Sequence, residues 1–365
     1  MGDWPTNAAA VSAEWLDAVL RRGGSLSNGK INAVSAADLG TGVGLMGEVS
    51  RLSIGYDKAA EGAPTTIIGK FPTSDPVNLH VARLLCFYSR EVAFYTRLAQ
   101  ASPIRTPRLF HAELDMSDHS FVLLLEDLRG AVPGDQVAGL APDQAETAIK
   151  AIGRVHAAWW GKVDAAGMEG LFDFGNPEYG AAVQSAYQHF LVPALDNFGD
   201  CYCDYTKKVA EGLGVAAARV IREQASSQRT LVHGDYRADN LLFGPSLGAD
   251  GMAAVDWQVS GRGGALYDVA YVISTSVPTA YRRQHEKALL GLYHDTLLAA
   301  GVKGFSVEEC WEAYRLAVLC ALFVAIFSAG GIDLGNHRGH EMVRTAARRI
   351  DNAVADLQAG DFLPA

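Results

Sequence analysis

The chain has 365 residues, of which 49% are hydrophobic and 20% are charged, and its formal net charge is −10. This length exceeds that of most single hydrophobic cores, so we expect two lobes with a cleft between them. The acidic balance, without a long run of Lys or Arg, argues against nucleic acid and anionic membranes as partners.

The cysteines and the apolar stretches bear on the cellular compartment. Five scattered cysteines without a C-x-x-C spacing predict neither disulfides nor a zinc site. The first residues lack the basic region and apolar stretch of a secretory signal. The uncharged stretch between Arg315 and Asp333 is marginal against the ~20 apolar residues that a bilayer requires, which favours a buried helix. We expect a cytoplasmic protein with no membrane attachment and no evident protein partner.

The chain is expected to begin with a short amphipathic helix and then to form strands. Ser12 precedes apolar residues at helical spacing, and Gly23 with the glycine after it ends the pattern. From Ile31 onward the pattern changes, and the segments 48–54 and 65–71 are typical of strands.

A long helix and a buried strand are expected next. Asp75 is a suitable N-cap and Pro76 a suitable first helical residue, and apolar positions at helical spacing continue to Leu98. The apolar run 121–125, bounded by charged residues, is typical of a buried strand. Helical patterns dominate from about Pro142. The sequence therefore predicts a β-rich N-terminal lobe, 1–128, and a mainly helical C-terminal lobe, 129–365.

The polar residues between two strand-like runs of the C-terminal lobe are suited to chemistry. They read His-Gly-Asp-Tyr-Arg-Ala-Asp-Asn, from His233 to Asn240. Phosphoryl transfer to an alcohol needs a carboxylate that accepts a hydrogen bond from the attacking hydroxyl, and oxygen ligands for magnesium. A lone Asp or Asn in a turn is more often a backbone cap, but the ordered set favours a catalytic site. We predict Asp235 and Asn240 as catalytic residues, and Asn240 and Asp256 as metal ligands.

This arrangement resembles the catalytic core of aminoglycoside phosphotransferases and ecdysteroid-kinase-like proteins. The resemblance is sharp over 231–268, fair over 40–128 and vague over 160–225. It implies an α+β, protein-kinase-like two-lobed fold with a small β-rich N-terminal lobe and a larger, mainly helical C-terminal lobe. It also implies ATP and Mg²⁺ as cofactors, with Asp235 similar to the catalytic base of that family.

Three further residues are expected to have structural roles. Asp268 resembles the aspartate that holds the catalytic loop in that family, and His233 is expected to orient the loop. His156 lies on an apolar helix, where a hydrogen-bonded core histidine is more common than a catalyst.

The N-terminal lobe contains a glycine motif. Gly42, Gly44 and Gly47 form a G-x-G-x-x-G, which is shared by dinucleotide-binding folds and kinases. A dinucleotide-binding fold requires a helix after this motif, whereas the residues 50–54 are typical of a strand. The order favours a kinase hairpin whose glycines let backbone amides approach phosphate oxygens, although an ordinary hairpin turn gives the same pattern.

The resemblance also assigns nucleotide-binding roles to four residues of this lobe. Lys70, on a predicted strand, is expected to meet the ATP phosphates and to pair with Glu91 on the following helix. Two other acidic residues, Glu113 and Glu126, compete for the role of Glu91. Glu126 and Leu128 are also assigned to the hinge between the lobes, where backbone groups contact adenine.

The acceptor is expected to be a small molecule. Eleven residues separate Asp256 from Asp268, which is too short for a peptide-docking segment, and no Ala-Pro-Glu element follows. The segment 172–205 is rich in aromatic residues that either line an apolar acceptor pocket or pack in the core. The same segment contains acidic residues, so its polarity stays open. Its aromatic and acidic residues are Phe172, Phe174, Tyr179, Tyr187, Phe190, Phe198, Tyr202 and Tyr205, and Asp173, Glu178, Asp196, Asp200 and Asp204.

We predict an ATP- and magnesium-dependent kinase that phosphorylates a hydroxyl group of a small molecule, with a lipophilic alcohol favoured by the closer resemblance to ecdysteroid-kinase-like proteins. A hydroxyacyl-coenzyme A kinase and an aminoglycoside or choline-type kinase are alternatives with the same core motifs. A nucleotide-binding pseudokinase is an alternative from another class, but the intact set of Lys70, Asp235, Asn240 and Asp256 argues against it.

Overall fold

The protein is described by a computed structural model in which the chain divides into two compact units. The N-terminal unit consists of Met1–Gln100 and Thr106–Gly130, and the C-terminal unit consists of Ala101–Arg105 and Ala131–Ala365. The structure describes residues 4–39, 46–58, 60–165, 167–168, 171–331 and 337–364.

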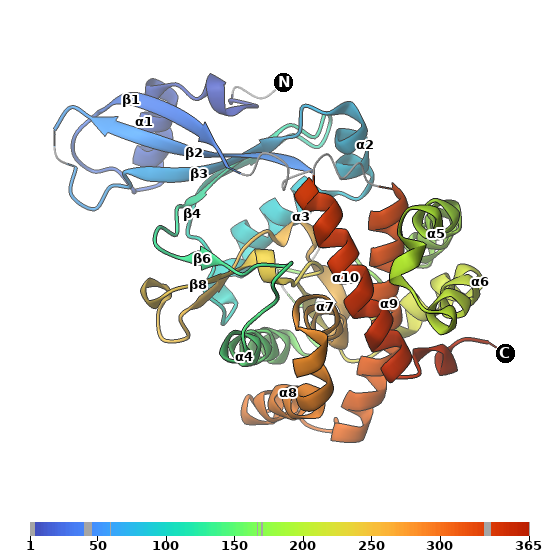
Figure 1. Ribbon diagram of the computed structural model, residues 1–365. Helices are drawn as coiled ribbons and strands as arrows, with labels where there is room; N and C mark the ends of the chain where they lie inside the picture. The colour runs from blue at the N-terminus through green and yellow to red at the C-terminus, as the bar shows by residue number, and fades with distance from the viewer. Residues whose placement is uncertain are drawn as a thin grey trace. The chain divides into compact units, whose positions relative to one another are not determined.

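The N-terminal unit is built on a five-stranded antiparallel sheet with the strand order β1-β2-β3-β5-β4 (Figure 1). In the register of this sheet, Lys70 lies opposite Val49 on one side and Leu123 on the other, so it occupies the centre of the sheet. The strands are β1 Ile31–Asp38, β2 Gly47–Tyr56, β3 Thr66–Pro72, β4 Leu109–Leu114 and β5 Phe121–Glu126.

The first helix, α1 (Ala13–Arg22), covers part of this sheet. The hydroxyl of Ser12 accepts a hydrogen bond from the amide of Trp15 at 3.1 Å, and this cap begins the helix as predicted. Leu16 and Leu20 are fully buried in a cluster that includes Leu52 of β2 and apolar residues of β3 and β5. Burial of one such side chain stabilises the fold by about 1.5–3 kcal/mol.

The long helix predicted after Asp75 is instead two helices, α2 (Pro76–Leu84) and α3 (Phe87–Ala93), so this prediction is wrong. The side chain of Asp75 caps α2 by accepting from the amide of Asn78 at 2.8 Å. The break occurs at Cys86, whose backbone is left-handed with φ 57°, a conformation that no helix can continue through. After the break, α3 buries Tyr88, whose ring stacks on Phe121 of β5 at 4.2 Å.

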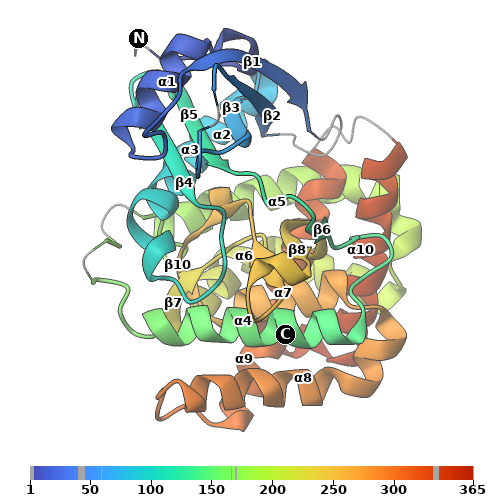
Figure 2. The ribbon, with the colours of Figure 1, turned by 90° about the vertical axis from the view of Figure 1, so that its left-hand side faces the viewer.

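The C-terminal unit is mainly helical, which together with the β-rich N-terminal unit confirms the predicted α+β fold class. Its central helix is α9, which contacts α5, α6, α7 and α10, and α4 and α8 run side by side in Figure 2. By length and composition alone α9 is apolar enough to cross a membrane, but here it packs against these helices as a core helix. The helices are α4 Pro142–Trp159, α5 Pro177–Phe198, α6 Asp204–Ser226, α7 Leu266–Ser276, α8 Thr279–Ala299, α9 Val307–Gly331 and α10 His337–Asp356.

Two small sheets interrupt the helices of the C-terminal unit. Strands β6, β8 and β9 form one antiparallel sheet, and β7 pairs with β10 in the other. Strand β10 lies in a glycine-rich stretch that predicts no strand, because glycine is usually depleted there. Close packing requires glycine in this strand, because a Cβ at Gly264 would lie 1.9 Å from the carbonyl oxygen of Gln224. The strands are β6 Val132–Pro133, β7 Arg229–Val232, β8 Leu241–Phe243, β9 Met252–Ala254 and β10 Gly261–Gly264.

Candidate active site

The loop that follows β7 is held by a buried carboxylate of α7. Asp268 accepts hydrogen bonds from the backbone amides of His233 at 2.7 Å and Gly234 at 2.9 Å. Nε2 of His156 lies 3.2 Å from the same carboxylate, and Nδ1 of His156 lies 2.9 Å from the hydroxyl of Tyr293. His156 is therefore the hydrogen-bonded core histidine that the sequence predicts, and it acts on the loop through Asp268.

The His233 side chain fixes the next part of the loop. Its Nε2 lies 3.0 Å from the carbonyl oxygen of Val255, and its Nδ1 lies 3.3 Å from the amide of Asp235. Burial lowers the pKa of His233, so the ring is neutral. One neutral tautomer satisfies both contacts, because Nε2–H donates to the carbonyl while Nδ1 accepts from the amide. His233 thus ties the loop to the segment that precedes Asp256.

Gly234 is required at its position by both conformation and space. Its φ is +84°, which residues with a side chain rarely adopt. A Cβ at this position would lie 2.2 Å from the carbonyl oxygen of Val259, far inside van der Waals contact. The glycine therefore lets the loop pass close to the segment after β9.

The two predicted catalytic residues are in direct contact. Nδ2 of Asn240 donates to Oδ2 of Asp235 at 2.8 Å and to its backbone oxygen at 2.9 Å. The sequence interpretation missed two other residues that act on this carboxylate. Nε of Arg237 lies 3.2 Å from Oδ2 of Asp235, and the negative charge of Asp235 adds to burial in raising the pKa of Tyr271.

Arg237 lies within the motif from His233 to Asn240, and this position is the feature of the sequence that marks it as part of the site. Its Nη1 also donates to Asp239 at 2.8 Å, so the guanidinium joins two carboxylates of one loop. Burial disfavours its charge, but Asp235 and Asp239 outweigh this and raise the pKa of Arg237. These contacts hold the Asp235 carboxylate in one orientation.

Asp256 lies beside Asn240 because β8 and β9 form a hairpin. Leu241 pairs with Ala254, and the amide of Val255 donates to the carbonyl oxygen of Asn240 at 2.9 Å. Asp256 then adopts a left-handed backbone with φ 65°, and Nε2 of Gln258 lies 3.3 Å from its Oδ2. The hairpin thus brings the backbone of Asp256 close to that of Asn240.

These two side chains fit a magnesium ion by the chemistry of their donors. The amide nitrogen of Asn240 is engaged with Asp235, which leaves its amide oxygen as a ligand, and Asp256 supplies a carboxylate. Mg²⁺ takes oxygen ligands and usually retains waters or substrate phosphates, so one or two carboxylates or amides suffice. Among the described residues there is no cluster of three or more His, Cys, Asp or Glu that would hold a metal by itself.

In the N-terminal unit, the structure contains the Lys70–Glu91 ion pair. Nζ of Lys70 lies 2.6 Å from Oε1 of Glu91, and the glutamate is 1% exposed. The competing acidic residues have other contacts: Glu113 lies 3.4 Å from His111, and Glu126 accepts from the amide of Arg108 at 2.9 Å. This geometry selects Glu91 as the partner of Lys70.

Two of the remaining residues predicted to bind nucleotide, Gly47 and Glu126, lie at the ends of strands. Gly47 is the first residue of β2, whereas Gly42 and Gly44 lie outside the described residues. Glu126 ends β5, and its amide donates to the carbonyl oxygen of Arg108. Leu128 follows two residues later, after Asp127, whose carboxylate accepts from Nε of Arg51 at 2.7 Å. The nucleotide-binding roles of these residues stay predictions.

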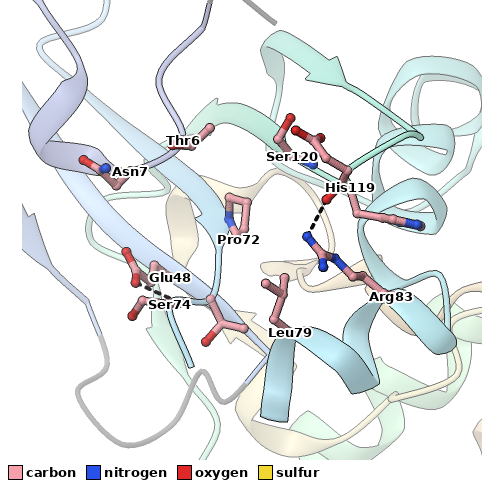
Figure 3. Close-up of a pocket in the computed structure, with 11 residues that line it drawn as sticks. Thr6, Asn7, Glu48, Pro72, Ser74, Leu79, Arg83, His119 and Ser120 are labelled. Atoms are coloured by element: carbon pink, nitrogen blue, oxygen red, sulfur yellow. Dashed lines mark hydrogen bonds between the residues drawn. The ribbon is translucent and has the colours of Figure 1, made fainter. Parts of the chain in front are cut away.

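The N-terminal unit also has a pocket of about 330 Å³ that the sequence does not predict (Figure 3). Its wall is polar: Nη2 of Arg83 donates to the carbonyl oxygen of Asp118 at 2.6 Å, and Glu48 accepts from the amide of Ser74 at 3.2 Å. None of the described residues predicted to bind nucleotide lines it. The lining residues are Thr6, Asn7, Glu48, Pro72, Thr73, Ser74, Leu79, Arg83, Asp118, His119 and Ser120.

The sequence matches a family model and two curated proteins. The model of the ecdysteroid kinase-like family matches residues 41–302. The chain is 52% identical over 88 residues to acyl-CoA dehydrogenase family member 10 of Mus musculus, a match that covers 24% of this chain and 8% of that protein. It is 22% identical over 262 residues to the uncharacterized oxidoreductase dhs-27 of Caenorhabditis elegans, covering 64% of this chain and 30% of that protein. The chain therefore spans less than a third of either relative.

Solved structures share the fold over nearly the whole chain. A choline kinase from Cryptosporidium parvum Iowa II has a TM-score of 0.55 at 10% identity, covering 97% of this chain and 98% of that chain. A protein of Ralstonia eutropha JMP134 assigned as an aminoglycoside phosphotransferase has a TM-score of 0.54 at 16% identity, covering 97% and 99%. Amicoumacin kinase, solved with AMP-PNP and Ca²⁺, has a TM-score of 0.50 at 11% identity, covering 93% of both chains. The predicted two-lobed, kinase-like fold is thereby confirmed.

Proposed function

The chain belongs to the ecdysteroid kinase-like family, and from this premise we propose that it transfers the γ-phosphoryl group of ATP to a hydroxyl group of a small molecule. The observation that carries the proposal is the contact between Asn240 and Asp235 at 2.8 Å, in a loop that Asp268 holds by two backbone amides. A carboxylate fixed in this way is oriented to accept a proton, and the side chain beside it offers an oxygen to a cation.

In the proposed reaction, Asp235 accepts the proton of the acceptor hydroxyl. The hydroxyl oxygen forms a bond to the γ-phosphorus, and the bond from that phosphorus to the bridging oxygen of ADP breaks. The products are a phosphate monoester and ADP, and the proton on Asp235 returns to solvent. Arg237 and Asn240 keep the carboxylate oriented during this step, since both donate to its Oδ2.

We propose Asn240 and Asp256 as the residues that hold Mg²⁺. The bound ion supplies positive charge that offsets the charge of the phosphate oxygens. On the N-terminal unit, we propose that Lys70 binds ATP phosphates while Glu91 keeps its ammonium group in place, which their 2.6 Å ion pair supports. Gly42, Gly44 and Gly47 are proposed to cover the phosphates, and Glu126 and Leu128 to contact adenine.

Substitution of Asp235 by Asn tests the proposed base. Asn keeps the shape of the side chain but cannot accept the proton, so we expect ADP release to fall by about 10²–10⁴-fold while ATP binding stays nearly unchanged. The assay measures acceptor-dependent ADP release, with mass detection of the product, over sterols, terpenoid alcohols, aminoglycosides, choline and hydroxyacyl esters. Asp250→Asn, in the turn between β8 and β9, is the matched control. Equal loss of ATP binding and phosphorylation in the Asp235 variant would contradict the assignment.

A lipophilic alcohol is the acceptor class that the family suggests by its description. A hydroxyacyl-coenzyme A ester is a second candidate, favoured by the 52% identity to a protein that is named as an acyl-CoA dehydrogenase family member. That match spans 88 residues and 8% of the relative, so it bears on a part of each protein. Competition distinguishes the candidates: free coenzyme A inhibits turnover only if the acceptor site accommodates its phosphates.

A further inference from the structure

Helix α10 carries a buried arginine, Arg349, which is 8% exposed. Its guanidinium group donates to three backbone carbonyl oxygens. Nη1 donates to the oxygens of Gln136 at 2.7 Å and Thr275 at 2.9 Å, and Nη2 donates to that of Val137 at 2.8 Å. Burial of a charge is costly unless hydrogen bonds compensate for it, so apolar packing of α10 does not account for an arginine here.

Capping of α7 explains only one of these three contacts. The last carbonyl oxygens of a helix have no partners within the helix, and a basic side chain often supplies them. Thr275 is the second to last residue of α7 and fits this role. Gln136 and Val137 belong instead to the segment before α4. Arg349 therefore joins this segment to the end of α7.

The segment 135–139 forms a turn that is shaped to receive the guanidinium group. The amide of Gly139 donates to the carbonyl oxygen of Asp135 at 2.7 Å, and the carboxylate of Asp135 accepts from the amide of Val137 at 2.8 Å. Gly139 has φ +89°, and a Cβ at this position would lie 2.9 Å from Nη2 of Arg349. The turn thus presents its carbonyl oxygens to Arg349 at close range.

Gln136 connects this turn to the catalytic loop. Its Oε1 accepts from the amide of Ala238 at 3.0 Å and from the hydroxyl of Ser276 at 2.9 Å, and its Nε2 donates to the carbonyl oxygen of Thr275 at 2.9 Å. Its backbone amide donates to Oδ1 of Asp239 at 2.9 Å. Gln136 is only 2% exposed, so little water competes for these bonds.

Asp239 continues the connection to the proposed base. Its Oδ2 accepts from Nη1 of Arg237 at 2.8 Å. Nε of the same guanidinium donates to Oδ2 of Asp235 at 3.2 Å. A series of hydrogen bonds therefore runs without a gap from α10, through the turn 135–139, to the carboxylate of Asp235.

We infer that Arg349 is a positioning residue, which fixes the catalytic loop at Ala238 and Asp239 and thereby orients the carboxylate of the proposed base, Asp235. The inference rests on the proposed function for the chemistry at this carboxylate. Asp268 holds the beginning of the same loop, so the loop is supported both from α7 and from α10.

Hydrogen exchange followed by mass spectrometry tests the support of the loop without any substrate. Arg349→Met keeps an apolar side chain and removes the guanidinium group, so we expect peptides that span 233–240 to exchange about tenfold faster while peptides of α5 keep their rates. Arg348→Met makes the same change at a neighbouring side chain that is 60% exposed, and this control should leave both rates unchanged. Unchanged exchange at 233–240 in Arg349→Met, or an equal increase in α5, would overturn the inference.

Arg349→Lys is measured in the same way, because Arg349→Met removes the donor of three buried carbonyl groups and lowers stability. Lysine keeps the positive charge, but its single nitrogen replaces two and cannot serve all three oxygens. We expect a smaller increase in exchange at 233–240, about threefold, again without a change in α5. No increase in this variant would also count against the inference.

Turnover measurements test whether the positioning extends to the base. ADP release is measured with sterols, terpenoid alcohols, aminoglycosides, choline and hydroxyacyl esters, well below the unfolding temperature. We expect kcat of Arg349→Met to fall about tenfold with KM for ATP unchanged, since the base is misplaced while nucleotide binding is not.

A double variant distinguishes positioning from a general loss of stability. Arg237→Met combined with Arg349→Met should be no slower than Arg237→Met alone, because both residues act on Asp235 through one series of contacts. Additive losses would overturn the inference. Absence of ADP release by the unsubstituted chain with every acceptor would refute the proposed function alone, and exchange at 233–240 would then decide whether Arg349 positions the loop.

Discussion

Replacing Asp268 by Asn removes the charge that holds the catalytic loop and leaves the shape of the side chain unchanged. The carboxylate is fully buried and accepts from two backbone amides, at 2.7 and 2.9 Å. An amide side chain has one oxygen, so it can accept from only one of these amides and turns an N–H toward the other. The variant therefore leaves one buried backbone donor without an acceptor.

The expected cost follows from these contacts. An unsatisfied buried donor costs about 1–3 kcal/mol, and the bond that remains loses the strength that the carboxylate charge gives it. We expect these two effects together to lower the free energy of unfolding by about 2–4 kcal/mol, from a total on the order of 5–15 kcal/mol. Folding should survive this loss, and the catalytic loop should be weakened first because both amides belong to it.

Urea unfolding followed by tryptophan fluorescence measures the change. Trp257 is fully buried and its ring lies 4.4 Å from that of His233, so its emission reports on the loop. Asp164→Asn is the control: it makes the same chemical change at a side chain that is 91% exposed, and we expect a shift within about 0.5 kcal/mol. Equal shifts in the two variants would refute the view that Asp268 carries the loop.

Three further predictions concern other parts of the chain. Lys70→Met removes the ammonium group that lies 2.6 Å from the buried Glu91 carboxylate and should destabilise the fold by about 3–5 kcal/mol. Lys70→Met with Glu91→Leu should recover most of this stability without ATP binding, and thermal unfolding and nucleotide titration measure both effects. Gly234→Ala should abolish soluble expression because its Cβ would lie 2.2 Å from a backbone oxygen. The control is Gly161→Ala, which is also at positive φ but in open space, and we expect it to lower the free energy of unfolding in urea by only about 1–2 kcal/mol. Burial lowers the pKa of His111 from 6.5, so in mild acid the unfolded chain binds more protons than the folded chain. The stability of the fold should therefore fall as the pH drops below this value. His111→Phe should reduce this fall, which urea midpoints at several pH values measure.

The sequence predicted the elements whose signals are local. Ser12 and Asp75 begin helices because each has a side-chain oxygen within reach of the amide three residues later. The order of Asp235, Asn240 and Asp256 predicted a shared site because a hairpin brings the last two together. The break at Cys86 was missed, since cysteine carries no turn signal and rarely adopts a left-handed backbone.

Residues whose contacts depend on the tertiary fold were harder to predict from the sequence. Asp235 raises the pKa of Tyr271 because α7 lies against the loop, and no spacing in the chain links the two residues. Arg237 was visible within the motif, but its contact with Asp235 depends on the short 3-10 turn that follows it. Strand β10 was missed because its glycines are selected by contacts with α6 and with Phe172.

The candidate catalytic residues have a local origin in this chain. The reactive groups come from one loop and the hairpin after it, so their arrangement is determined by nearby residues. The contact between the segment 172–179 and α7 instead joins residues that are far apart in the chain, through stacking of Phe174 on Tyr267. Solved structures that share this fold at 10–16% identity show that its arrangement of helices and strands survives wide change in sequence.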